Sequence, residues 1–243
     1  MQNCFFDPSG IQVRKPTWQV IFILVLCSIL LSCISTPALP DNKRPLSWAQ
    51  SIDPALNLYQ VDQHLYRSQQ PSASNVALLQ RLHIGTVINL RNSQTDQDLS
   101  GVAPLMLINV PMQTWAISSE EIAHALIQIQ DHRQQSNVLV HCQHGADRTG
   151  VVIAMYRIIY QHWTIDAARD EMKHGGFGFH PIWINIDHFF APKYIQQIKQ
   201  DIQKDQQNNQ QKDMKNNGLK QAELNYREKT RHQLSRVASP NAR

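Results

Sequence analysis

The sequence predicts an α/β fold made of a single domain, in which helices flank a central, mainly parallel sheet. Apolar runs of strand length alternate with runs in which apolar residues recur at helical spacing, and this alternation is typical of parallel sheets covered by helices. One strand-like run, 137–140, leads through a glycine-containing turn into a helix-like run, 151–159. With 243 residues, the chain is long enough for one sizeable core with appendages.

The first 35 residues are expected to be an export signal or a membrane anchor. No charged residue occurs from Pro16 to Pro40, the run 18–31 is almost wholly apolar, and Arg14 and Lys15 precede it. A basic segment before an apolar one is typical of a signal peptide, and a run of about 18 apolar residues is also long enough for a transmembrane helix. Either interpretation predicts a membrane-anchored protein whose domain lies outside the cytoplasm, on the periplasmic side in a bacterium.

The end of the apolar run, Leu30-Leu31-Ser32-Cys33, resembles a bacterial lipobox, which implies lipidation of Cys33. Processing at this position would remove the two earlier cysteines and leave Cys142 without a disulfide partner. A free thiol is what a nucleophile in an oxidising compartment requires.

Residues 36–55 are predicted to form a tether between membrane and domain, because prolines stand at four of these positions. The domain is then expected to span 56–200. The run 86–90 lacks proline and glycine, which predicts a central strand, while Ser118 with Glu121 and Thr164 supply helix caps. The predicted strands are 58–61, 65–67, 86–90, 105–110 and 138–140, and the predicted helices are 72–82, 118–132, 151–159, 164–172 and 184–198.

The charge of the chain lies mainly in its last segment. The formal net charge is +4, and residues 201–243 hold nine basic and five acidic side chains, so this segment supplies the whole excess. The rest of the chain is close to neutral, which argues against a nucleic-acid partner. Because large apolar residues are sparse after Asp201, we expect a polar, basic tail that is disordered or loosely helical.

The stretch HCQHGADRTG, residues 141–150, carries the chemistry. Five residues separate Cys142 from Arg148, enough chain for a loop whose backbone N–H groups converge on an anion. The helix that begins near Thr149 directs the positive end of its dipole at the same point, and an arginine fork matches two phosphate oxygens. The predicted phosphate-binding residues are Gln143, His144, Gly145, Ala146, Asp147 and Arg148.

Surrounded by this positive potential, Cys142 is predicted to be a thiolate that attacks phosphorus, with Thr149 donating a hydrogen bond to the sulfur. The resulting phosphocysteine would be hydrolysed by water, without a metal or a cofactor. A zinc site made of His141, Cys142 and His144 is disfavoured, since no second ligand pair stands at the usual spacing. An inert buried thiol and a phosphate-binding module without turnover remain open.

The stretch matches the signature H-C-x-x-G-x-x-R-[S/T]-G, and it resembles the cysteine-dependent tyrosine and dual-specificity phosphatases, in particular a bacterial branch in which an aspartate precedes the arginine. Tyr66-Arg67-Ser68-Gln69-Gln70-Pro71 resembles a segment near the start of atypical dual-specificity phosphatases. The resemblance implies a single phosphatase domain that acts on phosphotyrosine and on phosphoserine or phosphothreonine, in proteins or in small phosphoesters. A phosphoinositide or another non-protein phosphate is the alternative substrate.

The general acid is less evident. In the superfamily an aspartate in a mobile loop protonates the leaving oxygen, but the corresponding residues 111–116 contain no carboxylate. Asp147 is the best replacement, since phosphatases such as the myotubularins share an Asp-Arg pair; the alternative is that Asp147 only orients Arg148 or the loop. Asp96 and Asp98 are expected to be solvated turn residues, with a swing into the site from their loop as the alternative, and His144 is a further candidate donor.

Two further segments leave alternatives open. Arg67 either approaches the site or is structural. Residues 175–180, with three glycines and two phenylalanines, either form a wall over the substrate with His180 positioning water, or make a tight connection with a phenylalanine in the core.

Overall fold

The computed structural model describes residues 35–93, 95–101 and 104–237. The expected export signal or anchor, and with it Cys33, therefore lies outside the described residues. Within the described ranges, no helix is both long and apolar enough to cross a membrane.

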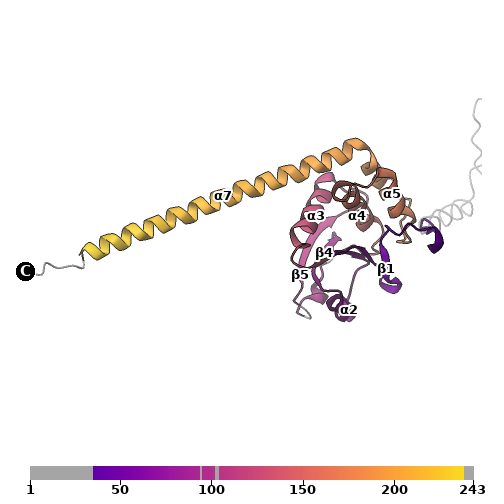
Figure 1. Cartoon of the computed structure of the whole chain (residues 1–243), viewed down its shortest axis with the longest axis horizontal. Coiled ribbons are helices and arrows are strands. Elements are labelled where there is room, and N and C mark those ends of the chain that lie inside the picture. Colours follow the sequence, from indigo (N-terminus) through magenta and orange to yellow (C-terminus); the bar gives the residue numbers. More distant parts are fainter. Residues whose placement is uncertain (1–34, 94, 102–103, 238–243) are drawn as a thin grey trace, which may run out of the picture.

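The described chain forms the predicted α/β fold around a six-stranded sheet (Figure 1). The order across the sheet is β1-β2-β3-β6-β4-β5. β1–β2 and β2–β3 pair antiparallel, whereas β3–β6, β6–β4 and β4–β5 pair parallel, so the sheet is mainly parallel as predicted. The strands are β1 (Gln50–Asp53), β2 (Leu58–Asp62), β3 (Leu65–Ser68), β4 (Ile84–Arg91), β5 (Met106–Met112) and β6 (Asn137–His141).

Helices cover both faces of the sheet, with α3, α4 and α5 on one face and α2 on the other (Figure 1). The predicted capping box of Ser118 and Glu121 begins α3, and the Thr164 side chain caps α5. The helices are α2 (Val76–Arg81), α3 (Ser119–His132), α4 (Asp147–Tyr160), α5 (Ile165–His174), α6 (Ile184–Asp187) and α7 (Pro192–Val237), and the 3₁₀ turns are η1 (Asp41–Lys43), η2 (Pro54–Leu56), η3 (Ala73–Asn75), η4 (Gln97–Leu99) and η5 (His188–Phe190).

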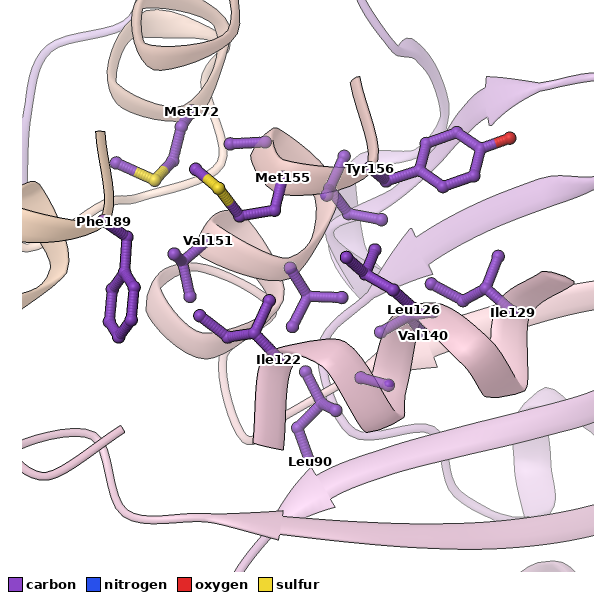
Figure 2. Close-up of a cluster of buried hydrophobic side chains, with 14 of the residues drawn as sticks. Leu90, Ile122, Leu126, Ile129, Val140, Val151, Met155, Tyr156, Met172 and Phe189 are labelled. Carbon is purple, nitrogen blue, oxygen red and sulfur yellow. The ribbon is translucent and has the colours of Figure 1, made fainter. Parts of the chain in front are cut away.

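Alternate residues of β6 serve two apolar clusters. Val138 and Val140 point into the larger one, which fills the space between the sheet and α3, α4, α5 and the start of α7, whereas Leu139 packs under α2. Figure 2 shows part of the larger cluster, with Val140 beside side chains of α3. Since side chains alternate across a strand, a strand buried on both faces is apolar in consecutive positions, here 138–140. Such a strand holds Cys142, the residue that follows it, in a fixed place.

The structure contradicts the predicted tether. Gln50–Asp53 forms the edge strand β1, and Trp48 and Ala49 are buried. Further upstream, Thr36 N–H donates to Phe179 O at 2.7 Å. The domain therefore begins about 20 residues earlier than expected. Prolines favour linkers, but they are equally suited to turns and to the ends of edge strands, and here the segment is bound by partners distant in the sequence.

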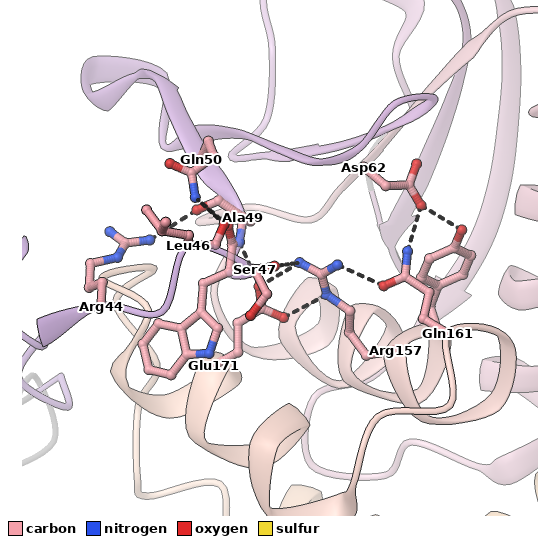
Figure 3. A network of polar contacts seen from close by, with 11 residues as sticks. Arg44, Leu46, Ser47, Ala49, Gln50, Asp62, Arg157, Gln161 and Glu171 are labelled. Atoms are coloured by element: carbon pink, nitrogen blue, oxygen red, sulfur yellow. Dashed lines mark hydrogen bonds and ion pairs between the residues drawn. The ribbon is translucent and has the colours of Figure 1, made fainter.

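A buried polar network attaches this segment to the helices (Figure 3). Ala49 N–H donates to Glu171 Oε1 at 2.7 Å, and Arg157 binds both oxygens of the same carboxylate, from Nε at 2.8 Å and from Nη2 at 2.7 Å. Arg157 Nη2 also donates to Ser47 O at 3.3 Å. The segment expected to be a tether is thus an integral part of the domain.

Of the two states expected for the tail, the structure shows the helical one, because α7 is one continuous helix to Val237 that projects from the domain (Figure 1). Its first turns bury Ile195, Ile198 and Ile202, and the side chains described beyond them are mostly exposed. Glutamine, lysine and arginine are good helix formers, so a polar segment extends the helix once packing has started it.

Candidate active site

Cys142 and Arg148 meet at the carboxyl edge of the sheet. Cys142 follows β6 directly, is 3% exposed, and carries a free thiol. Arg148 lies in the first turn of α4 and donates from Nη1 to the carbonyls of Leu90 and Met112, at 3.4 and 3.2 Å, near the ends of β4 and β5. The strand, loop and helix predicted from the sequence are therefore present, with the helix beginning at Asp147, two residues before Thr149.

The loop between Cys142 and α4 is held from outside through its carbonyl groups. Three donors, from β3, from the residues that follow it and from the turn before β2, reach three successive carbonyls. Gln70 N donates to Gln143 O at 3.1 Å, Asn57 Nδ2 to His144 O at 2.8 Å, and Arg67 Nη2 to Gly145 O at 2.6 Å.

These bonds fix the direction of the loop amides. In a trans peptide the C=O and the following N–H point to opposite sides. Carbonyls turned outward at residues 143–145 therefore turn the N–H groups of His144, Gly145 and Ala146 inward, toward the concave side of the loop. Together with the N-terminus of α4, inward N–H groups form a nest for an anion.

Only glycine fits the backbone geometry at position 145. Its φ is +70°, which is strained for other residues, and a Cβ atom would lie 2.4 Å from the carbonyl oxygen of Ser68. This close approach brings the loop against β3, where Arg67 reaches it.

Arg67 supports the loop and does not line its open side. The side chain is 1% exposed, its guanidinium lies 3.6 Å from the Phe177 ring centroid, and Nη2 binds Gly145 O. Burial lowers the pKa of Arg67 to about 10, against the opposing effect of the negative charge of Glu171. Arg67 was expected either to approach the site or to be structural, and the geometry matches the structural role. Its positive charge lies behind the loop, on the side of the outward-facing carbonyls.

Asp147 binds His180. Its Oδ1 accepts from the His180 N–H and its Oδ2 lies next to His180 Nδ1, both at 2.9 Å. In the glycine-rich segment 175–180, Phe177 and Phe179 are buried, as expected for a tight connection with a phenylalanine in the core. His180, at the end of this segment, reaches the loop. The His144 and His180 rings lie 6.1 Å apart, so the His180 imidazole is close to a side chain of the loop.

Asp96 was expected to be solvated, and the structure shows that this is wrong. The residue is 3% exposed, and its Oδ2 lies 2.9 Å from Nε2 of the fully buried His141. The polar loop after β4 folds inward because the buried imidazole and two amide side chains offer it hydrogen bonds. Asp98, two residues further on, is exposed as expected.

The Thr149 hydroxyl is buried and has no hydrogen-bond partner among the described residues. The predicted bond from Thr149 to the Cys142 sulfur is therefore not formed in this structure, although the donor is placed within the first turn of α4.

The residues that sequence reasoning missed are the ones that hold the loop. Asn57 binds the carbonyls of both His144 and Phe177, and its φ of 47° is a left-handed conformation that asparagine tolerates. Neither Asn57 nor Asp96 belongs to a recognisable motif, since each is separated from the loop by more than 40 residues. The sequence offered one indication of such residues, namely that they are polar and stand near the ends of predicted strands.

An anion nest that opens on a cysteine, with an arginine in the following helical turn, defines a cysteine-dependent phosphatase. The tyrosine phosphatase family model matches residues 52–217, and the chain belongs to this family. The dual specificity protein phosphatase TpbA of Pseudomonas aeruginosa is 43% identical over 167 residues, which cover 68% of this chain and 76% of TpbA.

Solved structures agree with the family. A crystal structure of P. aeruginosa TpbA is 36% identical with a TM-score of 0.60 and covers 66% of this chain and 99% of that one. A cysteine-to-serine variant of TpbA in complex with pTyr is 35% identical, also with a TM-score of 0.60, and covers 66% and 98%. The catalytic core of the PP-IP phosphatase SIW14 of S. cerevisiae is 26% identical with a TM-score of 0.54, covering 64% and 96%.

Proposed function

We propose that this protein is a cysteine-dependent phosphatase that hydrolyses phosphotyrosine, and also phosphoserine or phosphothreonine, in proteins. The observation that carries the proposal is the set of outward-held carbonyls at residues 143–145, which turns the loop amides toward one point beside Cys142. The similarity to TpbA, whose variant was solved with pTyr, supports phosphotyrosine as substrate.

The reaction follows from this arrangement. The loop amides and Arg148 bind the phosphoryl oxygens, and the Cys142 thiolate attacks phosphorus on the side opposite the leaving oxygen. The S–P bond forms, the P–O bond breaks, and the leaving oxygen takes a proton from the general acid. Water then attacks the phosphocysteine, returns a proton to that acid, and releases inorganic phosphate and the thiolate.

The test uses an aryl phosphate with the full chain and its Cys142→Ser variant. The serine variant is expected to lose turnover, because an alcohol at this position is a far weaker nucleophile, while it keeps its affinity for phosphotyrosine peptides. Acid quench of the wild type should trap phosphate on Cys142. Equal turnover by the two proteins would reject the enzyme, and binding without turnover by the wild type would indicate a non-catalytic phosphate-binding module.

Asp147 is our proposed general acid. His180 binds both of its oxygens, which fixes the orientation of the carboxyl group beside the loop. General acid catalysis is typically worth about 10²- to 10⁴-fold, and it matters most for poor leaving groups. Asp147→Asn should therefore slow alkyl phosphate hydrolysis about 10²-fold and aryl phosphate hydrolysis much less. Equal losses on both would mean that Asp147 only orients His180 and the loop.

A non-protein phosphate is the second candidate substrate, favoured by the similarity to the PP-IP phosphatase SIW14. A panel of phosphotyrosine peptides, phosphoinositides and inositol phosphates separates the two. A higher kcat/KM for the inositol compounds would reverse the assignment.

We also propose that the N-terminus anchors the protein to a membrane, with the catalytic domain outside the cytoplasm. The support is the basic and apolar pattern of residues 14–31 and the lipobox-like sequence ending at Cys33. Membrane fractionation of the full chain and of its Cys33→Ala variant tests this. Release of the variant alone indicates a lipid anchor, retention of both a transmembrane helix, and solubility of both would reject anchoring.

A further inference from the structure

His141, the residue before Cys142, has two ring nitrogens that both face oxygen atoms. Nε2 lies 2.9 Å from Asp96 Oδ2, and Nδ1 lies 3.2 Å from the carbonyl oxygen of Cys142. A carbonyl oxygen can only accept a hydrogen bond, so Nδ1 must carry a proton to make this contact. The charge of the ring then depends on whether Asp96 is ionised.

The surroundings of Asp96 favour its carboxylate form. Besides the contact with His141, its Oδ1 lies 2.5 Å from Gln70 Nε2 and 3.3 Å from Asn89 Nδ2. The orientation of both amides is set by Arg91, which can only donate: its Nη1 binds Gln70 Oε1 at 3.1 Å and its backbone N–H binds Asn89 Oδ1 at 2.8 Å. Both NH₂ groups are thus turned to Asp96, and donors stabilise the ionised form of a carboxyl group.

We propose that Asp96 is a positioning residue for the nucleophile, which keeps His141 as a doubly protonated imidazolium directly beside Cys142. With an ionised Asp96, both ring nitrogens face acceptors, and only the imidazolium can donate to both. The ion pair is neutral as a whole, but its positive end is toward Cys142 and its negative end is on the far side of the ring. A buried, fixed dipole of this direction stabilises the thiolate.

The variants that test this proposal do not alter the other charged groups around the nucleophile. Arg67 lies behind the loop, Arg148 lies in the first turn of α4, and Arg91 contacts the Asp96 cluster through Gln70. The His144 and His180 imidazoles lie on the Asp147 side of the loop. The inference deepens the proposed function, because it concerns the same nucleophile, but its test requires no turnover.

The experiment measures alkylation of Cys142 by iodoacetamide in the full chain, followed by peptide mass spectrometry so that other cysteines do not interfere. Asp96→Asn should slow alkylation about tenfold at about pH 6, where the thiolate depends on the imidazolium, and change it less than about twofold at about pH 9, where an ordinary thiol is mostly ionised. Asp98→Asn is the matched control, because it removes the same charge from an exposed position of the same loop, and it should have no effect.

The direction of the change is diagnostic. If Asp96 acted only as a nearby negative charge, its removal would favour the thiolate and alkylation at about pH 6 would become faster, which would overturn the proposal. In a His141→Asn background, Asp96→Asn should cause no further change, since residues that act through one another are not additive. An equal loss in both backgrounds would point to a role of Asp96 that does not involve His141.

A measurement on the unaltered protein covers the case in which the variants fail to fold. The ¹⁵N NMR shifts of the His141 ring should show two protonated nitrogens at about pH 7. A neutral ring at that pH would reject the proposal, whatever the protein hydrolyses.

Discussion

Arg67 and Arg157 are both buried, but their guanidinium groups have different partners. Arg157 in α4 forms a bidentate ion pair with the two carboxylate oxygens of Glu171, at 2.8 and 2.7 Å. Arg67 in β3 donates to the carbonyl of Gly145 at 2.6 Å and stacks on Phe177. Among the described residues, Arg67 makes no ion pair with a carboxylate.

The two arginines therefore contribute to different properties, Arg157 to stability and Arg67 to function. The charge of Arg157 is neutralised where it lies, so the pair holds α4, α5 and the N-terminal segment together. The charge of Arg67 is not neutralised by contact, and burial lowers its pKa to about 10 while the negative charge of Glu171 opposes that change. An uncompensated buried cation costs stability, and its position behind the loop favours an anion there.

The largest effect on stability is expected for Glu171→Gln. The variant leaves the buried charge of Arg157 without its counter-ion, and breaking a buried pair in this way typically costs about 3–5 kcal/mol. Urea denaturation should show a drop of this size in the free energy of unfolding, while kcat/KM of the folded protein stays within about twofold, since Glu171 does not touch the loop.

Glu223→Gln is the matched control for this variant. It breaks the exposed i,i+4 pair with Arg227 on α7, whose contact is 2.7 Å but whose side chains are mostly in solvent, so we expect a change of about 0.5 kcal/mol or less. Similar changes for the two variants would show that burial does not decide the contribution of these ion pairs.

The sequence was sufficient for features set by neighbouring residues. The apolar runs predicted the mainly parallel sheet, Ser118 with Glu121 predicted the start of α3, and the contiguous motif predicted the loop and Arg148. These features depend on periodicity, capping and local spacing, which are visible within about ten residues of chain.

The features that the sequence did not reveal depend on contacts between distant segments. Ala49 binds Glu171 across 122 positions, and this contact turns an apparent tether into part of the domain. Asp96 binds His141 across 45 positions, so a loop rich in polar residues folds inward. Composition indicated solvent in both cases, since a single sequence does not show which polar group has a buried partner.

Arg67→Met should have the opposite profile from Glu171→Gln. Loss of the bond to Gly145 releases the loop, and a displacement of about 1 Å in a reacting group can cost about 10²-fold in rate, so kcat/KM for an aryl phosphate should fall by about this factor. The free energy of unfolding should change by only about 1 kcal/mol, because the unpaired carbonyl is offset by relief from burying a charge.

Arg157→Met is the matched control, because it removes the same guanidinium group from an arginine that forms an ion pair. It should lower the free energy of unfolding by about 3–5 kcal/mol, because Glu171 is then left buried without its counter-ion, and it should change kcat/KM of the folded protein little. Affinity for vanadate, an anion that occupies phosphate sites, should weaken in Arg67→Met and not in Arg157→Met. If both arginines affected anion binding equally, the charge behind the loop would act through the general field of the domain and not through the Gly145 carbonyl.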